Sequence, residues 1–371
     1  MTARDPILVL GAGPAGSVAA IALARLGHTV TIVEKATFPR DKVCGECLSS
    51  TGIAVLERLD IAPAFRALGA TELRRSHLHA ADATTLSTDL PAPMLGLSRR
   101  AMDSSLLSHA CDARVSVHQP ATVDLPEDFD LSNVQIRDRD GRLTPASPFR
   151  YAIIADGSGS TLGKRPEPTG DFGIKAHFER VDTEADSIHL FAFGARRGYA
   201  GLAPVESGRF NVACSVPGQL LKRHRGDIDA LWAEQLERLP HLARRFQRAR
   251  RVTPWLSCPL PRFAVRREWP ANVIPIGNAA AALEPVGGEG MGLAMRSAEL
   301  AADAIHRAIR SERDLDVKSL RHSFNALWRR RRAACRATAL LLMNDTLGPP
   351  ALALAGEVSS LSRVGMRLIG K

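Results

Sequence analysis

The stretch ILVLGAGPAGSVAAIALARLGHTVTIVEK, residues 7–35, decides the fold of this chain. An apolar run ends at Gly11, a helical pattern follows, and a second apolar run ends at Glu34. Gly11 permits a tight turn, Gly13 lets the backbone approach a pyrophosphate, and Gly16 lets the helix pack on the strand. Glu34 is placed to accept hydrogen bonds from an adenosine ribose. The order strand, turn, helix, strand and acid therefore predicts a dinucleotide-binding βαβ unit.

Two later segments extend this pattern. The segment YAIIADGSGSTLGK is a short apolar strand that breaks into Asp156 and Gly157. Residues 272–305 read as a strand, then Gly277 and Asn278, then a loop rich in glycine, then a long helix. The three segments together resemble the FAD-binding motifs of the aromatic-hydroxylase and geranylgeranyl-reductase flavoprotein superfamily. Those motifs are G-x-G-x-x-G, D-G, and G-D followed by P-x-x-G-x-G, and Asn278 stands here in place of the last aspartate.

The resemblance covers most of residues 6–310 and implies FAD as the cofactor. It also implies an α/β fold: a three-layer Rossmann-like FAD-binding domain, an inserted antiparallel-sheet substrate domain and a C-terminal helical segment. The alternation in SIHLFAFG and RFNVACSV is typical of strands in the inserted part. The expected bounds are 1–72, 96–165 and 263–310 for the FAD-binding domain, 73–95 and 166–262 for the substrate domain, and 311–371 for the helical segment.

The resemblance also assigns residues to the cofactor. Arg40 is expected near the ribityl and phosphate portion, and Val123 near the adenine. Arg99 and Asp103 lie four residues apart on an expected helix, so Arg99 reaches toward FAD, forms an ordinary salt bridge, or does both. The expected FAD contacts are Gly11, Gly13, Pro14, Ala15, Gly16, Glu34, Lys35, Arg40, Cys44, Gly45, Arg99, Val123, Asp156, Gly157, Gly277, Asn278, Pro285, Gly288, Gly290 and Met291.

Cys44 and Cys47 form a C-x-x-C pair, which admits three interpretations. A zinc site needs about four ligands, but no second C-x-x-C is present and the histidines do not cluster, so no metal is expected. A redox dithiol would make the protein resemble the FAD-linked disulfide reductases, which also carry a second nucleotide-binding fingerprint. The nearest candidate for this second G-x-G-x-x-G begins at Gly157 and Gly159, but the spacing to its last glycine is one residue too long. The favoured interpretation is a flavin-lining loop with structural thiols.

Glu46 and Glu289 are the candidates for acid/base catalysis, and either is equally suited to be a structural hydrogen-bond acceptor. GYAGLAPVESGRFNVACSV resembles the reductases' substrate-wall motif G-Y-x-W-x-F-P. It keeps Tyr199, the third catalytic candidate, but has Gly201 for the tryptophan and Ala203 for the phenylalanine. Losing two aromatic side chains should widen the pocket for a hydrophobic small molecule, such as an isoprenoid, a polyketide or a carrier-bound metabolite.

The expected reaction is an oxidoreduction driven by NAD(P)H, which would bind transiently near Asp156 and Arg99. A helix expected from about Gly290 would direct its positive end at the flavin. Monooxygenation, double-bond reduction and dehydrogenation all suit the fold, which does not select among them; the lost aromatics favour monooxygenation. No tryptophans form the W-x-W-x-I-P segment of flavin halogenases, so halogenation is not expected. A non-enzymatic flavin-binding protein is the alternative from another class.

The chain has a formal net charge of +10 at pH 7, and the excess of Lys and Arg lies in residues 222–371. Scarce aromatic residues argue against nucleic acid as a partner. Arg329, Arg330, Arg332 and Arg336 form either a solvated helix face or a docking surface for an acidic carrier protein or an anionic membrane. No signal peptide or transmembrane run is recognised. The expected location is cytoplasmic, with peripheral membrane attachment as an option.

Overall fold

The computed structural model describes residues 6–126, 128–146, 148–157, 161–162, 170–261, 263, 265–357 and 365. Gly159, the second glycine of the candidate fingerprint, lies outside the described residues. So do residues 163–169 and most of the end of the chain after residue 357, which the expected domain bounds include. The domain bounds stay a prediction.

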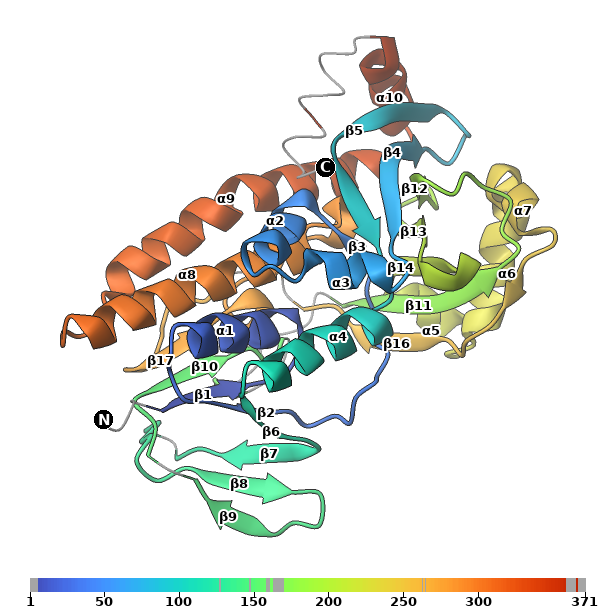
Figure 1. Ribbon diagram of the computed structural model, residues 1–371. Helices are drawn as coiled ribbons and strands as arrows, with labels where there is room; N and C mark the ends of the chain where they lie inside the picture. Colours follow the sequence, from blue (N-terminus) through green and yellow to red (C-terminus); the bar gives the residue numbers. More distant parts are fainter. Residues whose placement is uncertain are drawn as a thin grey trace.

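A five-stranded parallel sheet carries the dinucleotide motif (Figure 1). Its order is β17–β10–β1–β2–β6, and every neighbouring pair runs parallel. Its strands are β1 (Ile7–Leu10), β2 (Val30–Val33), β6 (Ser116–His118), β10 (Tyr151–Ile154) and β17 (Val273–Pro275). β1 and β10 are buried over their full length, as parallel strands are when both faces are covered. The predicted βαβ unit is confirmed.

Alternate residues of β1 face different layers. Ile7 and Val9 pack in a core with helices, whereas Leu8 and Leu10 pack with Ile136 of a small antiparallel sheet. The helices are α1 (Pro14–Arg25), α4 (Arg99–Asp112) and α8 (Gly290–Arg310). The small sheet contains β7 (Ala121–Asp124), β8 (Gln135–Asp138) and β9 (Leu143–Pro145). The predicted three-layer arrangement is confirmed.

A nine-stranded sheet forms the other half of the molecule (Figure 1). Its strands are β3 (Cys47–Leu48), β4 (Thr71–His79), β5 (Thr85–Gly96), β11 (Asp171–Glu179), β12 (Ser187–Ala192), β13 (Tyr199–Pro204), β14 (Phe210–Pro217), β15 (Arg250–Arg251) and β16 (Leu256–Pro259). The sheet is antiparallel as expected at its other strand pairs, but it is mixed because β4 and β12 pair in parallel. These two strands come from segments separated by α4 and by β10, so no hairpin sets their relative direction.

Helices cover both faces of the nine-stranded sheet. One face packs on α9 (Val317–Leu342) and α10 (Gly348–Glu357), and the other on α6 (Ile228–Arg238) and α7 (Pro240–Phe246). α6 and α7 are separate helices because Pro240, which lacks an amide hydrogen, starts α7. The remaining helices are α2 (Ser50–Arg58), α3 (Ala62–Ala67) and α5 (Gly218–Arg223).

The long helix α9 lies along α8 (Figure 1). Its buried stripe ends with Ala339 and Leu342, which lie four and seven positions after buried Cys335. Its buried residues are Leu320, Phe324, Trp328, Cys335, Ala339 and Leu342. None of the described helices combines the length and the apolar composition needed to cross a bilayer.

Candidate active site

Two adjoining cavities follow the carboxyl ends of the parallel strands, where open α/β sheets bind their ligands. Gly13, Lys42 and Ala155 line both cavities, so the two meet there and form one cleft. The first cavity is lined by the expected FAD contacts Gly11, Gly13, Glu34, Lys35, Arg40, Val123 and Asp156. The second is lined by Gly13, Pro14, Ala15, Cys44, Gly45, Arg99, Gly157, Gly277, Asn278, Pro285, Gly288, Gly290 and Met291. Gly16 lines neither cavity.

The three motif glycines have different surroundings. A Cβ atom at Gly16 would lie 1.9 Å from the Gly11 carbonyl oxygen, and one at Gly11 would lie 2.6 Å from the Ala155 carbonyl oxygen. These glycines hold α1, β1 and the end of β10 together, which confirms the packing predicted for Gly16. A Cβ atom at Gly13 would have a guanidinium nitrogen of Arg99 as its nearest neighbour, at 3.8 Å. Gly13 therefore faces the junction of the two cavities.

The first cavity has an acidic acceptor at its end. Glu34 is buried, and its carboxylate accepts hydrogen bonds from the amides of Ala12, at 2.7 Å, and Ala36, at 2.8 Å. Opposite it, Val123 of β7 lines the same cavity. Asp156 is held by Thr161, whose hydroxyl donates to it at 2.8 Å. This end offers a fixed carboxylate beside an apolar wall, which suits a ribose and an adenine.

The junction of the two cavities is cationic. Lys42 is exposed to solvent through the cleft, and its ammonium reaches within 3.1 Å of where a Cβ of Gly157 would lie. Desolvation of the ammonium between the cleft walls, and then repulsion by Arg99 and Arg40, lower its pKa to about 8. Lys42 was absent from the expected contacts, although it lies in the same short segment as Arg40. Its position suits a pyrophosphate.

Arg99 has a double role. Its guanidinium donates two hydrogen bonds to Asp103, at 2.8 and 2.6 Å, and Arg40 lies 3.3 Å from the same carboxylate. Burial acts to lower the pKa of Arg99, but the Asp103 carboxylate outweighs burial and holds the pKa above its ordinary value. The predicted i,i+4 salt bridge is confirmed. Arg99 also lines the cleft, so the bridge fixes a cation on its wall.

The second cavity is bounded by the start of α8. The short helix η3 (Pro285–Gly287) ends at Gly288 in the left-handed region, with a φ of 68°, and α8 begins at Gly290 as predicted. The first-turn amides of α8 lie at this end of the cleft and carry the positive end of the helix dipole. The apolar side chains lining this cavity include Leu260, Phe263, Ile276 and Leu283. Such a lining suits a flat, largely apolar ring system.

Neither cysteine of the C-x-x-C segment is in a disulfide. The Cys44 sulfur lies 3.8 Å from the Met291 sulfur and accepts a hydrogen bond from the Glu46 amide at 3.4 Å. The Cys47 thiol donates to the Gly45 carbonyl at 3.4 Å and is 6% exposed. Both cysteines line the cleft wall. The choice between structural thiols and a redox dithiol stays a prediction.

The catalytic candidate Glu46 is the centre of a buried ionic network. Its carboxylate accepts hydrogen bonds from Lys175, at 2.5 Å, and from the Arg99 amide, at 2.7 Å. Nε2 of His177 lies 2.6 Å from its other oxygen. Lys175 and His177 belong to β11 and are each 1% exposed. Because protein groups engage both oxygens, the structure favours the structural alternative for Glu46.

The other two candidates do not line the cleft. Glu289 is 2% exposed, and Arg331 of α9 lies 3.4 Å from its carboxylate, which explains why an arginine interrupts the apolar stripe of α9. Tyr199 is 3% exposed and donates a hydrogen bond to Glu284 at 3.0 Å. Glu284 does line the cleft, so Tyr199 acts on the cleft only through Glu284. Sequence reasoning missed Glu284, which carries no motif signal.

A third cavity, of about 510 Å³, adjoins the cleft at Glu284, which lines both. Its rim includes Leu340, Leu341 and Leu347, which are 50%, 39% and 58% exposed. Arg336 also lines it and donates to Glu284 at 2.8 Å, so this arginine is not a free surface charge. The positions of the missing aromatics, Gly201 and Ala203, are not among its lining residues. The third cavity is therefore not the pocket that the loss of the two aromatic side chains was expected to widen.

The expectation that the histidines do not cluster is wrong. His77, His79 and His189 come together because β4 and β12 are paired, and His79 and His189 form a hydrogen bond of 3.1 Å. Ligand atoms of His77, His189 and Glu184 lie within 4.8 Å of one another. However, the rings of His77 and His189 stack at 4.5 Å and 12°, so the lone pairs of the two rings lie in nearly parallel planes, which does not favour one shared ion. The cluster is a hydrogen-bonded stack.

The fold and the cleft define a dinucleotide-binding flavoprotein: a carboxylate at one end, a glycine turn and cations at the junction, and apolar walls at the other end. Residues 4–319 match the model of a protein family described as FAD binding domain. The chain belongs to this family. FAD is therefore the cofactor class for which the domain is built.

Among curated relatives, menaquinone reductase of Mycolicibacterium smegmatis is 28% identical over 324 residues, covering 82% of this chain and 76% of that protein. Digeranylgeranylglycerophospholipid reductase 2 of Methanopyrus kandleri is 28% identical over 319 residues, covering 82% and 78%. The protein is an FAD-dependent oxidoreductase of the reductase and monooxygenase kind.

Solved structures share the fold. A flavin-dependent brominase superposes with a TM-score of 0.82 at 19% identity, covering 99% of this chain and 93% of that one. A geranylgeranyl bacteriochlorophyll reductase-like protein of Thermoplasma acidophilum superposes with a TM-score of 0.74 at 19% identity, covering 99% of both chains. At these identities the likeness shows the fold alone. The expectation that this chain is not a halogenase stays a prediction.

Proposed function

We propose that the protein is an NAD(P)H-driven, FAD-dependent reductase of a hydrophobic, lipid-like small molecule. The observation that carries this proposal is the leucine-rimmed cavity beside α9, because Glu284 lines both this cavity and the cofactor cleft. Apolar side chains line one part of this cavity, and the charged residues Asp171, Arg196, Glu284 and Arg336 line another, so it would suit an apolar ligand that carries a polar group. The named reductases match 82% of this chain, whereas squalene monooxygenase matches 43%. Reduction is therefore preferred to the monooxygenation favoured by sequence.

The residues of the cleft fit FAD from end to end. Glu34 would hold the adenosine ribose, and Gly13 and Lys42 would hold the pyrophosphate. The first turn of α8 would present its amides to the ring system, and the apolar walls would exclude water. When bound, FAD would supply hydride transfer between the nicotinamide donor and the substrate. Tyr199 and Arg336 hold the Glu284 carboxylate in place where the two cavities meet.

The test follows NADH and NADPH consumption by the FAD-loaded protein, with menaquinone and a geranylgeranylated lipid as substrates in detergent micelles. Substrate-dependent consumption at the same rate with and without oxygen is expected. Turnover that requires oxygen would instead identify a monooxygenase. Absence of pyridine-nucleotide consumption with every substrate would favour the non-enzymatic flavin-binding alternative.

The substrate route is tested by polar substitutions at its rim. Leu341→Gln and Leu347→Gln should raise KM for a lipid substrate while leaving FAD binding unchanged. The matched control is Leu354→Gln on α10, which is 54% exposed but does not line the cavity. Equal KM values in all three variants would show that the substrate does not contact the leucine rim of this cavity.

The cysteine variants separate this reductase from a disulfide reductase. Cys47→Ser should keep turnover, and Cys44→Ser should at most weaken flavin binding. Loss of activity in both single variants, with FAD still bound, would favour the redox dithiol.

A further inference from the structure

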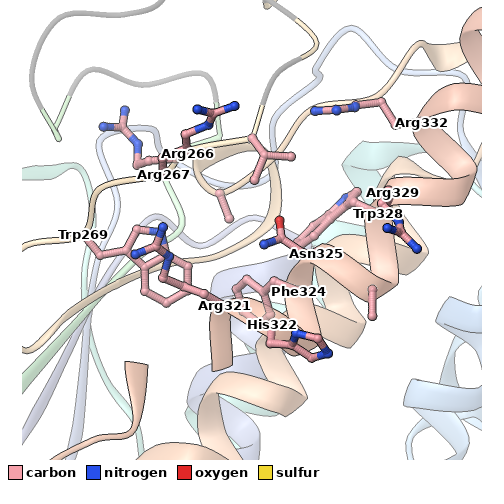
Figure 2. Close-up of a pocket in the computed structure, with 13 residues that line it drawn as sticks. Arg266, Arg267, Trp269, Arg321, His322, Phe324, Asn325, Trp328, Arg329 and Arg332 are labelled. Atoms are coloured by element: carbon pink, nitrogen blue, oxygen red, sulfur yellow. The ribbon is translucent and has the colours of Figure 1, made fainter. Parts of the chain in front are cut away.

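A fourth cavity, of about 700 Å³, lies apart from the cofactor cleft (Figure 2). It shares no lining residue with the other three cavities described here. A β-bridge between Val265 and Ala281 runs beside it. Val265 lines this cavity, whereas Phe263 and Asn278, in the same two segments, line the cofactor cleft. The two sites are thus neighbours on either side of one bridge.

The wall of this cavity is strongly cationic. Figure 2 shows Arg266 and Arg267 on one wall and Arg329 and Arg332 on α9 across from them, with Arg321 further along the same helix. The spacing of eight and then three positions from Arg321 puts the α9 arginines on one side of the helix. No carboxylate lines this cavity, and among the described residues none of the five guanidiniums has a carboxylate partner. Within the described part of the chain, the charge of the wall is therefore uncompensated.

The arginines are not equally available. Arg266 donates to the carbonyls of Leu162, at 3.0 Å, and Ala279, at 3.3 Å, so it holds the loop in place. The other four arginines form no side-chain hydrogen bond to a described residue. A guanidinium pairs well with phosphate because its planar fork matches two phosphate oxygens. The four that remain are Arg267, Arg321, Arg329 and Arg332.

The floor of the cavity is aromatic. Phe324 packs between Trp269 and Trp328, with ring centroids 5.5 and 5.4 Å away. The indole Nε1 of Trp269 is buried and has no hydrogen-bond acceptor among the described residues. Because this nitrogen is itself buried, Trp269 contributes its ring and not its N–H to the floor. The floor thus offers an apolar aromatic surface.

We propose that this cavity binds a phosphate-bearing organic anion. The four guanidiniums that have no partner among the described residues would hold the phosphate oxygens, and the aromatic floor would accept the apolar or ring portion of the ligand. A volume of about 700 Å³ is in the range of small-molecule sites. Arg329 and Arg332, which the sequence assigned to a solvated face or a protein- or membrane-docking surface, line this concave site instead. The site is separate from the reductase chemistry proposed above.

The test titrates FAD-loaded protein, so that the cofactor cleft is filled, with pyrophosphate by calorimetry. The pocket variant is Arg267→Gln, Arg321→Gln, Arg329→Gln and Arg332→Gln combined. The control variant is Arg225→Gln, Arg238→Gln, Arg310→Gln and Arg330→Gln, which removes the same charge from exposed positions outside the cavity. Pyrophosphate should bind at least about tenfold more weakly to the pocket variant than to the control variant.

Two further ligands distinguish a nucleotide from a lipid headgroup as the source of the bound phosphate. Adenosine diphosphate binding more tightly than pyrophosphate would identify a nucleotide, and binding to phosphatidate vesicles but not to phosphatidylcholine vesicles would identify a lipid headgroup. Equal loss of pyrophosphate binding in the pocket and control variants, or equal binding in both, would overturn the proposal. Should the combined variant lose its flavin absorbance, Arg321→Gln and Arg332→Gln alone give the same comparison.

Discussion

Tyr199 and Glu284 join the nine-stranded sheet to the cofactor cleft. Tyr199 begins β13, and its hydroxyl donates at 3.0 Å to Glu284, which lines the cleft. Burial first, and then the Glu284 carboxylate, raise the pKa of Tyr199 well above its ordinary value. The hydroxyl therefore remains a donor at neutral pH. Sequence reasoning listed Tyr199 as catalytic, but the geometry makes it a positioning residue.

Tyr199→Phe should lower the free energy of unfolding by about 1.5–3 kcal/mol, because a buried carboxylate loses a hydrogen-bond donor. It should also change KM for the substrate more than the affinity for FAD. Urea unfolding and steady-state kinetics measure the two effects. Tyr151→Phe is the control, since Tyr151 is equally buried but lies in the parallel sheet. Identical stability losses in both variants would contradict a special role for the Tyr199 hydroxyl.

Gly13→Ala and Gly16→Ala should act on different properties. A methyl group at Gly16 meets backbone at 1.9 Å, so Gly16→Ala should destabilise the fold by about 1–3 kcal/mol or more. A methyl group at Gly13 projects into the cleft, so Gly13→Ala should change stability little but weaken FAD binding by about tenfold or more. Thermal unfolding without FAD and fluorescence quenching of FAD separate the effects. If Gly13→Ala folds and binds FAD with wild-type affinity, the pyrophosphate of FAD does not contact Gly13.

Lys42 predicts a pH dependence of FAD binding. Its pKa of about 8 in the free protein should rise when a pyrophosphate binds, because an anion stabilises the ammonium. FAD affinity should therefore be constant below about pH 8 and fall above it, with proton uptake on binding. Lys42→Gln should bind FAD more weakly at neutral pH and lose this dependence. A wild-type affinity that is flat from pH 7 to about 9.5 would contradict contact between Lys42 and a phosphate.

The network of Glu46, Lys175 and His177 predicts a rescue. Glu46→Gln removes the nearer carboxylate of the buried Lys175 ammonium, leaving only Asp41 at 3.8 Å among the described carboxylates, and should cost about 3–5 kcal/mol of stability. Adding Lys175→Met removes the stranded charge, so the double variant should be more stable than Glu46→Gln alone. Urea unfolding of Glu46→Gln, Lys175→Met, the double variant and the wild type gives the double-mutant cycle and its interaction free energy. Additive losses would show that the two side chains do not stabilise each other.

The histidine stack predicts acid sensitivity. Burial, followed by the neighbouring cationic groups, lowers the pKa of His79 to about 2 and that of His189 to about 3. Below the ordinary value of 6.5 the unfolded chain binds protons that the folded stack does not. Stability should therefore be full above about pH 6.5 and fall toward pH 3 by about 1.4 kcal/mol per pH unit for each histidine.

Urea midpoints measured at intervals of pH test this sensitivity. His189→Phe should reduce the slope, whereas His322→Gln, a change of an exposed histidine on α9, should leave it unchanged. A slope that is the same in all three proteins would assign the acid sensitivity to other groups.

The local motifs were predictable from sequence because their signals are short-range. The glycine turn, Glu34 and the start of α8 at Gly290 each depend on residues a few positions apart. The network around Glu46 was not predictable, since Lys175 lies 129 positions away and only the pairing of folded elements brings it near. The same reason applies to Glu284 and to the histidines, which meet through a parallel strand pair that no hairpin specifies.

The sheet order of the nucleotide-binding layer has a consequence for how the chain matures. β1, the central strand, pairs with β10, which in turn pairs with β17, and the cleft is closed only by the loop and helix that follow β17. During synthesis the N-terminal glycine turn leaves the ribosome long before these partners exist. Such non-local pairing is slow, and partly made domains expose apolar surface. The cofactor is therefore captured only after the segment that ends with α8 has been synthesised.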